Sequence, residues 1–451
     1  MRSEEVPGKS AACRGPRRAR AALSGIAKGA GLALGLALGL GLAAAGAGSL
    51  AHAAPPASTA ATMCLLGGQV VDPTHQSVSR ADVVIDGDRI TRVGPEAGAG
   101  CAGRTIDVHG KFVMPGLIDL HVHLEGNPSP TEVAAEDPGI EATMQLVLRT
   151  GLMDMLDLAP NPSVSFPLRD KLRGALNYPG LRVAAVIFLS GRSQSADQDR
   201  ALVRKQAGWR PDVLKVIPFD SPSFGATLGE ASKLGIKTVV HINTWEEARA
   251  AVEAGATVIT HFQDSVIIPD ELVRLMAARH TLLLPTLAVQ CEIGRLSKTP
   301  ALLDDPLLAQ VTTPALRQQY RQREQYTDKA RRWVRWQQSD CVANDFVSLR
   351  KLRDAHVTFL AGSDTGNLGT FQGYSTHREL ELMAEAGLSP WDTLRAATTR
   401  AAEFLGIKWG IGAGLPANLL VLDGSPVDSI SNTRRIARVI YRGRLVVGAQ
   451  P

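Results

Sequence analysis

Cysteines and aromatic residues are scarce in this 451-residue chain, and neither forms a pattern that carries chemistry. Five cysteines occur and none belongs to a Cys-x-x-Cys pair, which argues against a cysteine-ligated metal site. Aromatic residues make up 5% of the chain, and no basic stripe with interleaved aromatics follows the first 53 residues. This argues against binding to nucleic acid.

The first 53 residues have the pattern of a secretory signal. Basic residues between Arg14 and Lys28 precede an apolar Ala/Gly/Leu run, and Ala51-His52-Ala53 supplies small residues for cleavage after Ala53. We therefore expect an exported protein, periplasmic or extracellular. Retention of the long apolar run as a membrane anchor stays open as an alternative, and it would be the protein's contact with a membrane.

The basic character of the chain belongs to this leader. Residues 1–53 hold seven Lys or Arg and two acids, a net charge of +5, which equals the net charge of the whole chain. The mature chain is therefore close to neutral, and its charge predicts no acidic partner.

Four cysteines remain after removal of the leader, in a compartment where disulfides form. We expect Cys64 to pair with Cys101, because both fall in the first small segment, and Cys291 to pair with Cys341 across a long insertion. Free buried thiols are the alternative.

The order of the apolar runs predicts two domains after a flexible mature N-terminus at 54–62. Short alternating runs over 63–113, with a hairpin turn at Asp86-Gly87, and further runs over 412–451 predict a small β-sandwich built from both terminal segments. Over 114–411, strand-like runs alternate with helix-like segments, which is typical of an α/β (β/α)8 TIM barrel. A helical insertion is expected at about 290–345. The expected barrel strands are Leu117–His121, Gly151–Asp157, Leu181–Leu189, Val213–Ile217, Thr238–Ile242, Val258–His261, Thr281–Pro285 and Val357–Ala361.

Chemically active residues end several of these runs. Asp119-Leu120-His121-Val122-His123 completes the first run, and residues i and i+2 of a strand share a face, so His121 and His123 project together. Because the carboxyl ends of barrel strands open on one face, we expect four later residues to join them: Lys215, His241, His261 and Asp364. Nitrogen and oxygen donors of this kind suit zinc or a similar divalent ion. Each residue alone also has a structural explanation, but six such coincidences in the right order argue against it.

These motifs resemble the amidohydrolase superfamily, in its branch of imidazolonepropionase-like and prolidase-like (Xaa-Pro dipeptidase-like) proteins. The resemblance covers nearly everything after about residue 63. It rests on the segments 112–123, 361–365, 377–382, 396–399 and 418–426, together with Lys215, His241 and His261.

The resemblance implies a site with two divalent metal ions, which we expect to be zinc. His121, His123 and Asp364 would hold one ion and His241 and His261 the other, with an N-carboxylated Lys215 as the bridge between them. Asp364 would be the catalytic residue that moves a proton while a metal-activated hydroxide attacks the carbonyl. Asn243, Tyr374 and His377 are candidate contacts to the substrate.

We accordingly expect an exported metal-dependent hydrolase acting on the amide bond of a small molecule, either a dipeptide or an N-acyl amino acid. Ile217 departs from the resemblance, because prolidase-like proteins often have a Tyr there, and so do the segments 157–161 and 243–245. Two alternatives therefore stay open. The same site could hydrolyse a cyclic amide, a lactone or a carbamate, or the fold could serve as a non-catalytic envelope binding protein. Assembly as a homo-oligomer is also left open.

Overall fold

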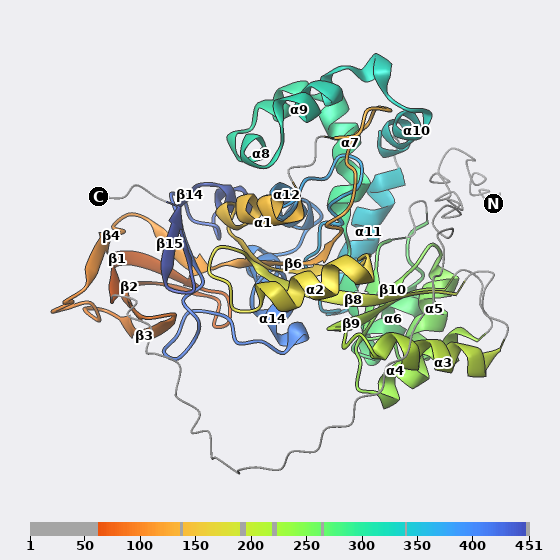
Figure 1. Cartoon of the computed structure of the whole chain (residues 1–451), viewed down its shortest axis with the longest axis horizontal. Helices are drawn as coiled ribbons and strands as arrows, with labels where there is room; N and C mark the ends of the chain where they lie inside the picture. Colours follow the sequence, from red (N-terminus) through yellow and green to blue (C-terminus); the bar gives the residue numbers. More distant parts are fainter. Residues whose placement is uncertain are drawn as a thin grey trace, which may run out of the picture.

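The computed structural model of the chain describes residues 62–135, 139–189, 195–218, 223–262, 266–338 and 341–447. The leader expected at 1–53, and the following residues up to 61, lie outside these ranges. Within the ranges, none of the helices has the length and apolarity that a membrane crossing needs. The described chain comprises a strand-and-helix barrel, a separate sheet to one side and a group of helices above the barrel (Figure 1).

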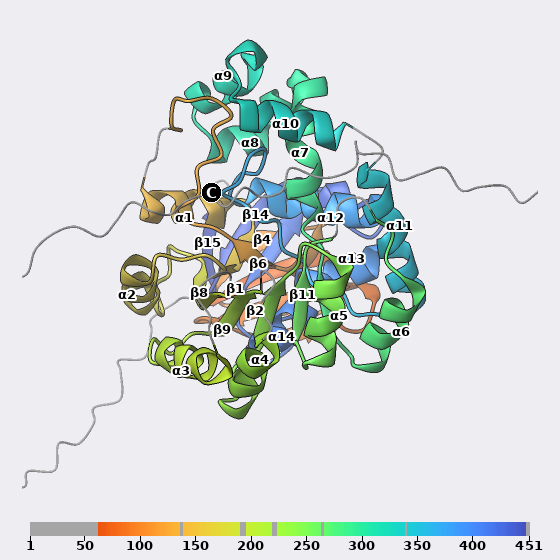
Figure 2. The ribbon, with the colours of Figure 1, turned by 90° about the vertical axis from the view of Figure 1, so that its right-hand side faces the viewer.

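Seven parallel strands form most of the barrel, and each pairs with the next one along the chain. Helices surround them on the outside (Figure 2). The strands are β6 (Leu117–Val122), β7 (Leu152–Asp157), β8 (Gly180–Phe188), β9 (Val213–Ile217), β10 (Thr238–His241), β11 (Val258–Thr260) and β12 (Leu282–Leu284). The helices are α1 (Ile140–Arg149), α2 (Pro162–Leu172), α3 (Ala196–Ala207), α4 (Phe224–Lys233), α5 (Trp245–Glu253), α6 (Asp270–Ala278), α11 (Cys341–Asp354), α12 (Tyr374–Glu385), α13 (Pro390–Ala396) and α14 (Thr399–Leu405).

The segment 357–365 occupies the eighth position of the barrel. It makes isolated parallel bridges to β12, at Leu283 and Phe359, and to β6, at Val122 and Thr365. The backbone N–H of Leu120 also donates to the carbonyl of Ala361 at 3.0 Å. The expected strand at 357–361 is therefore only a set of bridges, because the segment bonds β12 near its start and β6 near its end. The predicted barrel is confirmed as nearly closed.

Alternate side chains of the barrel strands enter two different cores. In β9, Leu214 and Val216 pack outward among the helices, whereas Val213 packs inside the barrel with Val239 and Val258. The sequence of β9 is apolar at nearly every position because both of its faces are buried. The exception on the inner face is Lys215.

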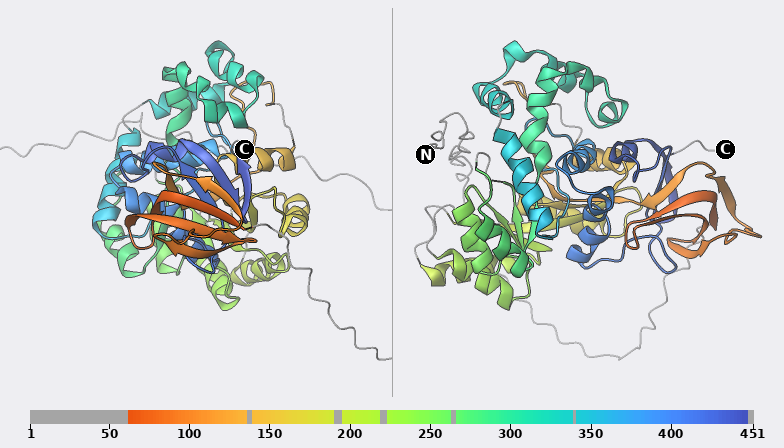
Figure 3. Two further views of the ribbon diagram at one scale, coloured as in Figure 1. Left: turned by 90° about the vertical axis from the view of Figure 1, so that its left-hand side faces the viewer. Right: turned by 180° about the vertical axis from the view of Figure 1, so that it is seen from behind.

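The second sheet contains strands from both ends of the chain, as the predicted fold requires (Figure 3). Residues from both ends share its core, including Leu65 and Val83 from the first part and Leu419 and Val421 from the last. The strands are β1 (Met63–Asp72), β2 (Ser77–Asp86), β3 (Arg89–Gly94), β4 (Arg104–Asp107), β5 (Phe112–Pro115), β13 (Leu419–Leu422), β14 (Ile436–Tyr441) and β15 (Arg444–Val447), and a short 3-10 helix, η4 (Ile430–Arg434), precedes β14.

One of the two expected disulfides is present. Cys64 of β1 is bonded to Cys101, which closes a loop with a sequence separation of 37 residues. Cys291 is a free thiol. The expected pairing of Cys291 with Cys341 is therefore wrong.

The helices above the barrel follow β12 and have a small apolar core of their own. They are α7 (Leu287–Lys298), η2 (Pro300–Asp304), α8 (Pro306–Val311), α9 (Pro314–Arg321), η3 (Arg323–Gln325) and α10 (Asp328–Gln337), and together we call them the cap. Tyr320 of α9 joins the cap to the barrel loops, because its hydroxyl donates to the carbonyl of Pro128 and accepts from the N–H of Gly369 at 2.7 Å. The first of these loops follows His123 and the second follows Asp364.

Candidate metal centre

His121 and His123 lie at the carboxyl end of β6, side by side as the strand spacing predicts. Their ring centroids are 5.1 Å apart. The His121 ring is 1% exposed, and its Nδ1 lies 3.1 Å from the hydroxyl of Thr260 on β11. This contact directs the other ring nitrogen of His121 toward Asp364.

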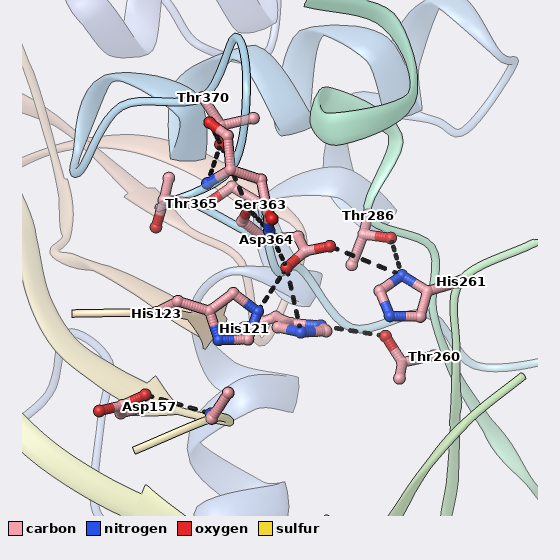
Figure 4. Close-up of polar contacts among 12 residues, drawn as sticks. His121, His123, Asp157, Thr260, His261, Thr286, Ser363, Asp364, Thr365 and Thr370 are labelled. Atoms are coloured by element: carbon pink, nitrogen blue, oxygen red, sulfur yellow. Dashed lines mark hydrogen bonds and ion pairs between the residues drawn. The ribbon is translucent and has the colours of Figure 1, made fainter. Parts of the chain in front are cut away.

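Asp364 brings the histidines of different strands together (Figure 4). Its Oδ1 lies 2.6 Å from Nε2 of His123 and 3.3 Å from Nε2 of His121, and its Oδ2 lies 3.9 Å from Nδ1 of His261. The amide of Asn367 donates to Oδ1 at 2.8 Å. Burial alone would raise the pKa of Asp364, but the three imidazoles outweigh burial and hold that pKa well below its usual value.

His241 and His261 complete a continuous group of four imidazoles. The ring of His261 lies 4.4 Å from that of His241 and 5.0 Å from that of His121, centroid to centroid. Strand alternation would send His261 outward with Ile259, which packs among the helices. The backbone of His261 has φ 79° instead, in the left-handed region, and this reversal directs the ring inward.

Lys215 lies on the inner face of β9, 2% exposed. Burial is the largest cause that holds the pKa of His121 well below its ordinary value, and the ammonium group of Lys215 is the second. Lys215 is therefore close enough to act on the histidine group. The six residues expected at the strand ends converge on one region of the barrel.

The three candidate substrate contacts are placed differently. Both ring nitrogens of His377 are 2.9 Å from structural partners, the hydroxyl of Thr433 and the carbonyl of Thr150, and its side chain is fully buried. Tyr374 is part of the apolar core of the cap. These hydrogen bonds and packing contacts of His377 and Tyr374 do not include the group around Asp364, and the assignment of both as substrate contacts stays a prediction. Asn243 is exposed, and its Oδ1 lies 3.4 Å from Nε2 of His241, so it stays a candidate.

Several buried polar residues around the site were not selected from the sequence. Asp119 accepts hydrogen bonds from the hydroxyls of Ser363, at 2.5 Å, and Thr376, at 2.7 Å, and so joins β6 to the Asp364 loop and α12. Burial raises the pKa of Asp119. Its place two residues before His121 in an otherwise apolar run was the signal available in the sequence.

Asp157 at the end of β7 is a second buried carboxylate beside the site (Figure 4). It accepts hydrogen bonds from the hydroxyl of Ser165, at 3.1 Å, and from the N–H of Ala159, at 3.2 Å. Burial raises the pKa of Asp157 to about 6, against the opposing charge of His123.

The donor set fits a divalent metal. Ligand atoms of His121, His261 and Asp364, all buried, lie within 4.8 Å of one another. Nδ1 of His123 is buried without a hydrogen-bond partner among the described residues. Imidazole nitrogens around a carboxylate are donors that zinc and similar ions prefer, and a purely structural cluster would leave no reason to bury so many titratable groups together.

The last half of the chain matches a known family. The model described as "Amidohydrolase family" matches residues 221–446, which is half of the chain. The chain belongs to the amidohydrolase family. The match includes His241, His261 and Asp364, while His121, His123 and Lys215 precede it.

Solved amidohydrolase structures share the fold along nearly their whole length. A Xaa-Pro dipeptidase with bound methionine in the active site is 20% identical, with a TM-score of 0.68, over 85% of this chain and 99% of that one. A putative prolidase from Bifidobacterium longum is 21% identical, with a TM-score of 0.65, over 87% and 96%. Phenylurea hydrolase B is 19% identical, with a TM-score of 0.65, over 85% and 96%. Prolidase-like proteins, the branch expected from the sequence, are therefore among the proteins that share this fold.

Curated relatives match over short segments. The dihydroorotase of Trichlorobacter lovleyi is 33% identical over 88 residues, 20% of this chain and 18% of that protein. The adenine deaminase of Deinococcus radiodurans is 43% identical over 61 residues, 14% of this chain and 11% of that protein. The matched segments thus span less than a fifth of these relatives. Membership of the amidohydrolase family supports a hydrolase that acts on carbon–nitrogen bonds.

Proposed function

We propose that this chain is an exported, metal-dependent amidohydrolase that cleaves the amide bond of a dipeptide or an N-acyl amino acid. The observation that carries the proposal is the convergence of four imidazoles, Asp364 and Lys215 at the carboxyl ends of the barrel strands, where TIM-barrel enzymes have their active sites. The amidohydrolase family match and the prolidase-like folds support amide hydrolysis.

The residues divide into two sets of metal ligands in this proposal. His121, His123 and Asp364 would hold one divalent ion, and His241 and His261 would hold the second, with zinc suited to these donors. Lys215 would join both sets as an N-carboxylated side chain, because carboxylation turns a buried cation into a negative group that favours the binding of metal ions. When bound, the two ions would supply Lewis-acid polarisation and lower the pKa of a water molecule.

Asp364 is the residue placed to move the proton. Its carboxylate would accept the proton from the attacking water and pass it to the departing amine. The Asn367 amide, 2.8 Å from Oδ1, holds the carboxylate in one orientation. The hydroxyls of Thr260 and Thr286 engage Nδ1 of His121 and His261 and fix the orientation of both rings.

Export is part of the proposal and is supported by the disulfide between Cys64 and Cys101, since such bonds persist mainly in oxidising compartments. The leader pattern of residues 1–53 supports it as well.

A second candidate function uses the same residues on a cyclic amide, a lactone or a carbamate. It is favoured by the apolar side chain of Ile217 at the end of β9, which offers no hydrogen bond to a substrate carboxylate. Matches to dihydroorotases and a fold shared with phenylurea hydrolase B also support chemistry other than dipeptide cleavage.

The test combines metal analysis with a substrate screen on the full-length purified protein. We expect close to two metal ions per chain and turnover of at least one dipeptide or N-acyl amino acid. Lys215→Ala and Asp364→Asn should each lower kcat by on the order of a hundredfold or more. Lys237→Ala, an exposed lysine at the opposite end of the barrel, is the control and should keep full activity. Full turnover by Lys215→Ala would refute the proposed site, and turnover of lactones or carbamates alone would establish the second candidate.

A further inference from the structure

The inner faces of β8 and β9 carry apolar side chains toward the open end of the barrel. Core membership fixes which side chains point inward. Ala185 and Ile187 of β8 pack outward with the helices, and Ala184 packs inside the barrel. By strand alternation, Val186 and Phe188 therefore face inward with Ala184.

The same reasoning places Ile217 on the inner face of β9. Leu214 and Val216 pack outward and Val213 packs inside the barrel. Lys215 and Ile217 alternate with the outward pair, so both point inward. Ile217 is the last residue of the strand and lies one step closer to the open end than Lys215.

These inward side chains become more exposed toward the open end. Ala184 is fully buried and Val186 is partly exposed, while Phe188 is 43% exposed. The outward neighbour Ile187 is 1% exposed. At the carboxyl ends of the strands, an inward side chain reaches solvent through the open end of the barrel, so Val186, Phe188 and Ile217 line the space above the site. We call these three residues the apolar wall.

The apolar wall adjoins the candidate metal ligands directly. In the sheet register, Val186 lies opposite Lys215, and Phe188 lies opposite Ile217. Val239 lies opposite Lys215 on the other side, so His241, two residues further along β10, is level with Ile217. A molecule whose scissile bond meets His241 and Lys215 therefore has the wall beside it.

The wall contrasts with the strand that follows it. Asn243, just after β10, carries an exposed amide next to His241. Among the described residues of β8 and β9, the inner face beyond Lys215 has no charged or hydrogen-bonding side chain. A carboxylate or ammonium group placed against it would lose its hydration without gaining a partner, which is costly.

We infer that the substrate presents an uncharged, apolar group to β8 and β9, and that Val186, Phe188 and Ile217 determine this specificity. The inference rests on the proposed function and adds the chemical class of one substrate group. An apolar contact of this kind discriminates between substrates by the apolar surface area that each one removes from water.

Two hydroxamates that differ only in their apolar tail provide the test. Acetohydroxamate and hexanohydroxamate share a metal-binding head, and hexanohydroxamate has four more methylenes. We expect the zinc-loaded full-length protein to bind hexanohydroxamate more tightly by on the order of tenfold or more, measured by calorimetry. In the double variant Phe188→Ala/Ile217→Thr, the ratio of the two affinities should fall to below about threefold. Both affinities are measured on one preparation, so a fraction of inactive protein affects them equally and cancels in their ratio.

Leu234→Ala is the matched control, because Leu234 is 44% exposed, nearly the same as Phe188, but follows α4 at the other end of the barrel. It should keep the wild-type ratio. Equal affinity for both hydroxamates in the wild type, or a ratio that survives in the double variant, would overturn the inference while leaving the metal site intact. Absence of binding by both hydroxamates would instead refute the proposed function on which the inference rests.

Discussion

The hydroxyl of Thr286 lies 2.7 Å from Nδ1 of His261. The same hydroxyl donates to the carbonyl of Pro285 at 2.7 Å. It can therefore only accept from the imidazole, which places the ring proton on Nδ1 and the lone pair on Nε2. Thr286 has φ 56°, a left-handed conformation that is unusual for a β-branched residue. Such strain is retained where the surrounding structure requires it, and here it positions a candidate metal ligand.

Removal of this hydroxyl should weaken metal binding. We expect Thr286→Val to lower the zinc affinity of the full chain by about 10- to 100-fold, because His261 loses the partner that fixes its tautomer. Competition with a chromophoric chelator measures this directly. Thr286→Ser keeps the hydroxyl and should restore most of the affinity.

Thr393 provides the matched control for this prediction. It is fully buried, and its hydroxyl has no hydrogen-bond partner among the described residues. Thr393→Val should leave zinc affinity unchanged and should not lower stability. If Thr286→Val bound zinc as tightly as the wild type, the positioning role of Thr286 would be disproved.

The fold could be predicted because both faces of the barrel strands are buried. Such strands are continuous apolar runs, and a residue such as Lys215 or His241 is conspicuous within one. The predicted limits of β9 coincide with the structure. The eighth position was harder, because the bridges at Phe359 and Thr365 depend on partners in β12 and β6 that the local sequence does not reveal.

The sequence could not show how the site is held together. The left-handed backbone of His261 reverses the direction that strand alternation would give this residue, and no local residue type signals this. Thr260 and Thr286 are ordinary residues in the sequence, and their roles depend on contacts with distant strands. The contact of His377 with Thr433 could not be predicted for the same reason, since the two residues lie 56 positions apart.

Tyr320 should couple the cap to both loops of the site. Tyr320→Phe removes the hydroxyl shared by Pro128 and Gly369 and leaves both backbone groups without that partner. We expect a loss of about 1–3 kcal/mol in the free energy of unfolding and faster hydrogen exchange at Gly369. Tyr178→Phe is the control, because it removes a more exposed hydroxyl bound to Glu141 at 3.3 Å, and it should cost less than about 1 kcal/mol. Unchanged exchange at Gly369 would show that the hydroxyl does not couple the cap to the loop.

The disulfide should stabilise the terminal sheet. Cys64 and Cys101 close a loop with a sequence separation of 37 residues, and the chain-entropy relation gives about 4 kcal/mol for a loop of this length. Urea unfolding of Cys64→Ser should show a loss of this order, and the variant should no longer respond to reductant. Cys291→Ala should respond to reductant as the wild type does, because Cys291 is a free thiol. A wild-type protein whose unfolding midpoint is insensitive to full reduction would contradict this prediction.

Acid should destabilise the protein partly through His377. Burial lowers the pKa of His377 from 6.5 to about 4, against the opposing hydrogen bond to the Thr150 carbonyl. The unfolded chain therefore takes up a proton near pH 6.5 that the folded chain refuses until about pH 4. The contribution of this group to the free energy of unfolding is fully present above pH 6.5. It falls by about 3 kcal/mol as the pH drops from 6.5 to 4, and it changes no further below pH 4.

The variant His377→Asn isolates this contribution. It should be less stable than the wild type near pH 7, because the contacts to Thr433 and Thr150 are disturbed, but the difference between the two proteins should shrink as the pH falls from 6.5 to 4. Contributions from other groups, such as the buried carboxyl of Glu379, whose pKa burial raises to about 8, are common to both proteins and cancel in the difference. His280→Asn, which replaces an exposed histidine, is the control for loss of an imidazole. A constant difference between wild type and His377→Asn across this range would show that His377 takes up its proton equally in the folded and unfolded chains.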